Sequence, residues 1–196
     1  MTIQPPTPPG PHLVPLPDQL RQLDPAPEPR VLAIVDAEHA RWRALHDRLV
    51  ALIVELLDLA VEDRAVNDVI QRLIGETTIS IDDLVGSRVD PVEIAALLRA
   101  HGSVGDVDIT PEATTFVHQC GSGGRYWLEN PQVATVSGGE VPGVPPAVPR
   151  YCARCIASID AHAHGAWTVT PPDQPQHRCT WTVLTPAASR SSDEAP

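Results

Sequence analysis

The chain contains no lysine. All 14 of its basic residues are arginine, against 25 acidic residues, and its formal net charge is −11. Proteins that bind nucleic acids rely on basic surfaces that release counterions from phosphates. This charge balance therefore argues against a nucleic-acid partner.

Long apolar runs are also absent. The longest, from Leu49 to Val61, is interrupted by Glu55 and Asp58, and it is shorter than the roughly 20 apolar residues that a membrane helix needs. The start Met-Thr-Ile-Gln-Pro-Pro has neither the positive nor the apolar region of a secretory signal. We expect a soluble, cytoplasmic protein with no membrane partner.

Signatures of catalysis are missing as well. The sequence has no Gly-x-Ser-x-Gly and no His-Glu-x-x-His, and the glycines from Gly121 to Gly124 lack the Lys and Ser/Thr of a phosphate loop. We expect no catalytic residues outside a metal site and no organic cofactor.

What the sequence does have is a group of cysteines in its last part: Cys120, Cys152, Cys155 and Cys179. The spacing Cys152-Ala-Arg-Cys155 is typical of a tetrahedral zinc site. Because cytoplasmic thiols stay reduced, a metal is favoured over disulfides. The pattern predicts one structural zinc ion bound through Cys120, Cys152 and Cys155, with either Cys179 or His118 as the fourth ligand.

Residues 114–165 resemble the treble-clef and zinc-ribbon group, in which a hairpin knuckle and a helix that opens with Cys-x-x-Cys share one zinc. Here the hairpin would consist of strands at 114–117 and 126–128 with a turn at Gly121–Gly124, and the helix would run from Cys152 to His164. The usual two-cysteine knuckle is replaced by His118-x-Cys120. A catalytic zinc needs an open position and usually a nearby Glu or His base, and the sequence lacks the His-x-Glu and Pro-Cys-x-x-Cys contexts of a zinc deaminase, so we expect a structural metal.

The first half of the chain shows helical periodicity. From residue 42, large apolar residues recur in alternating steps of three and four, which is the a/d pattern of a coiled coil. These residues are Trp42, Leu45, Leu49, Leu52, Leu56 and Leu59. We expect them to be buried against another helix, from this chain or from a second copy.

A second apolar face follows the first, at Val50, Ile53, Val54, Leu57 and Val61. The periodicity continues through Ile74, so the pattern predicts either one helix over 31–75 or a helical hairpin with a bend near Glu62–Arg64. Asp90-Pro91-Val92-Glu93 is a capping box that predicts a helix over 91–101, stopped by Gly102. Residues 77–81 form either a strand or an extended turn.

Further along, strands are expected at 167–169 and 181–184, and a long surface loop at 136–150. Trp127, Trp167 and Trp181 would form either the core of this module or interface anchors. His39 and His46 are expected on a solvated helix face. Residues 1–29 include ten prolines, and both this arm and the tail 186–196 are predicted to be disordered.

The sequence thus predicts an α+β protein: a disordered proline-rich arm (1–29), a helical region (30–103), a small zinc-stapled β-rich module (112–185) and a tail (186–196). The function expected is that of a non-enzymatic, zinc-containing interaction or assembly protein, which binds a protein partner or itself through residues 31–75. The alternatives are a zinc-dependent transcriptional or nucleic-acid-associated regulator and a metalloenzyme with an open zinc site.

Overall fold

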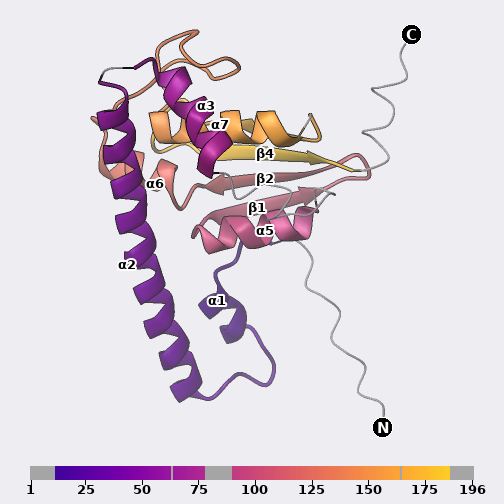
Figure 1. Ribbon diagram of the computed structural model, residues 1–196. Coiled ribbons are helices and arrows are strands. Elements are labelled where there is room, and N and C mark those ends of the chain that lie inside the picture. Colours follow the sequence, from indigo (N-terminus) through magenta and orange to yellow (C-terminus); the bar gives the residue numbers. More distant parts are fainter. Residues whose placement is uncertain (1–11, 63, 78–89, 164, 186–196) are drawn as a thin grey trace.

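The computed structural model describes residues 12–62, 64–77, 90–163 and 165–185. Over these residues the chain is an α+β protein, in which a long N-terminal helix is followed by a small antiparallel four-stranded sheet (Figure 1). Some of the sequence predictions concern parts of the chain outside the described residues. These parts are residues 1–11, 78–81 and 186–196. Among the described helices, none is long and apolar enough to cross a membrane.

Among the connections that the structure describes in full, the longest is the one before α7, at residues 130–149. The helices are α1 (Leu16–Arg21), α2 (Pro29–Ala60), α3 (Val66–Thr77), α5 (Pro91–Ala100), α6 (Gly123–Glu129) and α7 (Arg150–Ala163). The strands are β1 (Val104–Ile109), β2 (Ala113–Gln119), β3 (Trp167–Thr170) and β4 (Cys179–Leu184).

The sheet has the strand order β1-β2-β4-β3, and each neighbouring pair is antiparallel. Phe116 lies opposite Trp181, and His118 lies opposite Cys179, in the pairing of β2 with β4. Alternate residues of β2 and of β4 are buried, as expected for a sheet with one covered face. The helices α5 and α7 cover this face.

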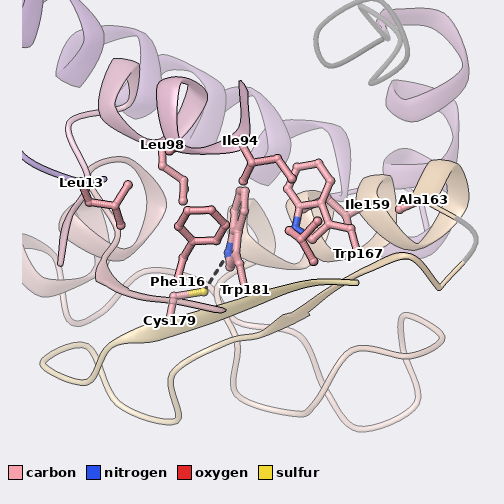
Figure 2. Close-up of a cluster of buried hydrophobic side chains, with 11 residues drawn as sticks. Leu13, Ile94, Leu98, Phe116, Ile159, Ala163, Trp167, Cys179 and Trp181 are labelled. Atoms are coloured by element: carbon pink, nitrogen blue, oxygen red, sulfur yellow. Dashed lines mark hydrogen bonds between the residues drawn. The ribbon is translucent and has the colours of Figure 1, made fainter. Parts of the chain in front are cut away.

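The main core lies between that face of the sheet and the two helices (Figure 2). Phe116 is fully buried at the centre of this core, beside Trp181. The ring centroids of Trp167 and Trp181 are 4.9 Å apart. Ile94 and Leu98 of α5 pack into the same cluster, together with Leu13. Because Trp127, Trp167 and Trp181 are only 2–7% exposed, the three indoles belong to the core and are not interface anchors.

The helical region is divided where a bend was predicted. The helix α2 ends at Ala60 and α3 begins at Val66, so the single helix over 31–75 is excluded. Figure 1 shows α2 lying along one side of the molecule, past the end of the sheet. The second apolar face of α2 is buried as predicted, since Val50, Val54 and Leu57 pack against Val69 and Tyr151.

The first apolar face of α2 is exposed. Its six members, which we call the α2 stripe, are 39–63% exposed, and no described element covers them; they are Trp42, Leu45, Leu49, Leu52, Leu56 and Leu59. The prediction that another helix of this chain buries the stripe is therefore wrong for the part of the chain that the structure describes. Burial against a second copy stays a prediction.

Local signals predicted α5 and α7 correctly. Asp90 accepts a hydrogen bond from the Val92 amide at 2.8 Å and Pro91 occupies the first turn of α5, the arrangement that a capping box favours. The helix α7 runs from Arg150 to Ala163, close to the expected 152–164. The hairpin β3–β4 also lies where strands were expected.

Three further predictions about secondary structure need correction. Residues 126–128 belong to α6 rather than to a strand, so β2 pairs instead with β1, a strand that was not predicted, and with β4. In the proline-rich arm, residues 16–21 form α1, and Leu13 is 2% exposed because it packs into the main core.

The third correction concerns the loop at 136–150. It carries four buried valines, which pack against α3 and α7 and form a second core; they are Val136, Val141, Val144 and Val148. An irregular segment can be buried in this way when its backbone polar groups are bonded. Here Val136 and Val148 are joined by a backbone hydrogen bond of 2.8 Å.

Candidate metal centre

The four cysteines come from three elements that the sheet brings together. Cys120 directly follows β2, Cys152 and Cys155 lie in the first turns of α7, and Cys179 is the first residue of β4. All four thiols are free, and all four line one cavity of about 350 Å³. Tertiary structure thus brings to one cavity the three cysteines predicted as zinc ligands together with Cys179, one of the two candidates for the fourth ligand.

The glycine segment allows α6 to approach the cysteines. A Cβ atom on Gly123 would lie 2.9 Å from the Sγ atom of Cys152, and one on Gly124 would lie 2.9 Å from the Cβ atom of Cys120. Both distances are shorter than side-chain packing permits. These glycines therefore serve a close approach of backbone to the thiols rather than the tight hairpin turn that was expected.

Cys179 lies against the aromatic core. The Trp181 indole N–H donates a hydrogen bond to its Sγ atom at 3.2 Å (Figure 2), and the thiol is 3.5 Å from the Thr170 carbonyl oxygen. Burial raises the pKa of Cys179 well above its usual value, and the indole N–H opposes this shift because a donor to sulfur stabilises the thiolate. Cys179 can therefore act as a metal ligand without losing this indole partner.

Burial keeps the metal-free thiols of Cys152 and Cys155 protonated. It raises the pKa of Cys152 well above its usual value, and the nearby thiols of Cys120 and Cys155 add to this effect. Burial also raises the pKa of Cys155 to about 11, although the Arg154 guanidinium opposes the shift. Metal binding at these thiols would consequently release protons.

The side chains are not arranged as a finished metal site. Within the ranges that the structure describes, no three His, Cys, Asp or Glu side chains are positioned to hold a metal ion together. The soft donors and their shared cavity nonetheless suit zinc.

His118 lies in the core and does not line the cavity that the four cysteines share. It is fully buried, and its ring packs edge-on against Trp181 with centroids 5.5 Å apart. Burial lowers its pKa to about 4, so the imidazole is neutral near pH 7. Neither ring nitrogen has a hydrogen-bond partner among the described residues. As a candidate fourth ligand, His118 is less well placed than Cys179.

A polar cluster that was not predicted from the sequence lies beside the cavity. His101, at the end of α5, lines the cavity, and its Nδ1 atom is 3.2 Å from the Nε2 atom of His46. Arg43 donates hydrogen bonds to the carbonyl oxygens of His101 and Gly121 at 2.6 and 2.9 Å. The cluster connects α2 to the segment that carries Cys120.

His46 was expected on a solvated face but is only 5% exposed. The one signal in the sequence was its position, since His46 is four residues before Val50, on the face of α2 that packs against the rest of the protein. No local pattern connects His101 or Arg43 to the cysteines.

The paired histidines predict a pH dependence of stability. Burial lowers the pKa of His101 to about 4, with smaller contributions from His46 and two arginines, and burial also lowers the pKa of His46. The unfolded chain therefore binds protons below about pH 6.5 that the folded chain does not, so the free energy of unfolding falls between about pH 6.5 and pH 4. Between pH 7 and pH 4.5, the free energy of unfolding of His101→Asn is expected to fall by about 2 kcal/mol less than that of the wild type.

Urea unfolding at both pH values, with a chelator present to exclude effects of metal, measures this difference. If the free energy of unfolding depends on pH in the same way for the wild type and for His101→Asn, then the pKa of His101 is the same in the folded and unfolded states.

In comparisons with protein-family models, curated proteins and solved structures, none matches this chain.

Proposed function

We propose that this is a non-enzymatic, zinc-containing interaction or assembly protein. The observation that carries the proposal is the exposed α2 stripe. Soluble proteins rarely leave a continuous row of large apolar side chains in water unless it binds something. The helix that presents the row is firmly held, because its opposite face is buried and Arg43 joins it to two other segments.

Zinc has a stabilising role in this proposal. One ion bound through Cys120, Cys152, Cys155 and Cys179 would link the end of β2, the start of α7 and the start of β4. The shared cavity wall supports Cys179 as the fourth ligand. A structural zinc contributes its binding free energy directly to folding.

A metalloenzyme with an open zinc site is a second candidate, favoured by the cavity beside the thiols. With three cysteine ligands, the fourth position of the ion would face a volume of about 350 Å³. The variant Cys179→Ser distinguishes the two candidates. Strong loss of zinc affinity supports a closed structural site, whereas unchanged affinity supports an open one.

A nucleic-acid-associated regulator has less support. Residues 112–185 contain four arginines and five acidic residues, and three of these arginines already form ion pairs: Arg125 with Glu129, Arg150 with Asp58, and Arg178 with Asp106. The fourth, Arg154, lies over the ring of Tyr151. Such a surface offers little to a phosphate backbone.

The interaction proposal predicts different costs for two leucines of one helix. Leu52, in the stripe, is 49% exposed, whereas Leu57 is 2% exposed. We expect Leu52→Ala to change the free energy of unfolding by less than about 0.5 kcal/mol, and the matched control Leu57→Ala to cost about 2–5 kcal/mol. Urea unfolding provides both values, at a concentration where sedimentation shows a single chain. Equal costs would mean that the stripe serves the fold of the chain and not an interaction.

A further inference from the structure

The spacing of the α2 stripe suits one kind of partner. Its six residues alternate steps of three and four along α2, so they repeat every seven residues and form the seam of a two-helix coiled coil. A seam of this kind needs a second helix with the same repeat. No other described helix of this chain is free to supply one, but a second copy supplies it by symmetry.

The stripe can pair while α2 stays attached to the rest of the chain. The residues that face the protein body are His46, Val50, Val54 and Leu57. At 3.6 residues per turn their mean direction lies roughly 130° around the helix axis from that of the stripe. A partner helix on the stripe therefore does not displace the contacts that hold α2 in place.

Charges beside the stripe decide the orientation of the pair. Arg48 and Glu55 are seven residues apart, so both lie on the edge of the stripe that points away from the protein body. In a parallel pair this edge would face the other edge of the partner, where His46 and Ile53 lie and no acidic residue is available. In an antiparallel pair the edge faces itself, which places Arg48 of each copy against Glu55 of the other.

We propose that two copies of this chain associate through the α2 stripe as an antiparallel helix pair. Leu49 packs against Leu52 of the second copy at the centre, Trp42 packs against Leu59 at the ends, and two Arg48–Glu55 pairs flank the seam. The inference rests on the proposed function, because it names the partner of the same interaction surface.

Sedimentation velocity on the zinc-supplemented full chain, between about 1 and 100 µM, tests the association. We expect the mass to rise from one chain of 21.1 kDa toward two. The double variant Leu49→Glu/Leu52→Glu is expected to stay monomeric throughout. Its matched control, Ile109→Glu/Leu128→Glu, changes two apolar residues outside the stripe that are 61% and 47% exposed and should dimerise like the wild type.

Charge exchange tests the orientation. In the dimer, Arg48→Glu turns both Arg48–Glu55 pairs into pairs of like negative charge, and Glu55→Arg turns both into pairs of like positive charge. Each single variant should therefore raise the dimer dissociation constant about tenfold. The combined variant Arg48→Glu/Glu55→Arg restores opposite charges and should return to within about threefold of the wild type. Failure of the double variant to recover would overturn the antiparallel arrangement.

A wild type that remains monomeric at 100 µM overturns the second copy as partner. That result is distinguishable from failure of the interaction proposal, which depends on the separate comparison of Leu52→Ala with Leu57→Ala. A dimer that persists in Leu49→Glu/Leu52→Glu would show that the stripe is not the interface.

Discussion

Cys152→Ser is expected to abolish zinc binding and to lower the melting temperature of the zinc-loaded protein by about 8–16 °C. By mass action, a ligand specific for the folded state contributes about 4 kcal/mol when its free concentration is about a thousand times the dissociation constant. For a chain of this size, each kcal/mol corresponds to roughly 2–4 °C. Elemental analysis of the purified protein and thermal unfolding measure the two effects.

A chelator separates loss of metal from loss of packing at Cys152. Chelation should lower the melting temperature of the wild type but leave that of Cys152→Ser unchanged, because the variant has no metal to lose. We expect the whole described fold to be destabilised, since α5 and the sheet share the core that adjoins the cysteines. Wild-type protein that binds no zinc when saturating zinc is supplied would contradict the metal proposal.

The second large effect is expected at the centre of the core. Phe116 is fully buried between the sheet and the helices, and its replacement by alanine removes most of a side chain from a close-packed site. We expect Phe116→Ala to cost about 3–5 kcal/mol in urea unfolding.

Two variants serve as controls for Phe116→Ala. Phe116→Leu retains most of the volume and should cost clearly less than the alanine variant. Ile109→Ala, on the outer strand β1, changes a side chain that is 61% exposed and should cost less than about 0.5 kcal/mol. A cost below about 1 kcal/mol for Phe116→Ala would contradict the position of this ring in the core.

The elements that were predicted correctly have strong local signals. The helix α5 has an acidic cap, a proline in its first turn and a regular apolar face, all within a few residues. The break between α2 and α3 lies between Ala60 and Val66, in the stretch where the apolar pattern of the sequence is interrupted. Signals of this kind act through neighbours in the chain and can be recognised without knowledge of the fold.

The elements that were predicted wrongly depend on distant contacts. Tyr126 and Trp127 favour strands by residue type, yet they lie in α6, where Trp127 is buried and Arg125 forms an ion pair with Glu129 one turn later. The strand β1 was missed because its burial pattern is weak; it lies at the edge of the sheet and is held by pairing with β2.

The candidate site shows the same division. The sequence by itself determined which residues have metal-binding chemistry, because a Cys-x-x-Cys spacing is local, and it also determined the heptad repeat of the α2 stripe. Only the tertiary structure decided that Cys179 shares a cavity wall with Cys120, Cys152 and Cys155, and that His118 lies outside it. The pairing of β2 with β4 sets the positions of His118, Cys120 and Cys179, and such pairing is specified by the burial of a whole sheet face rather than by the residues nearby in the chain.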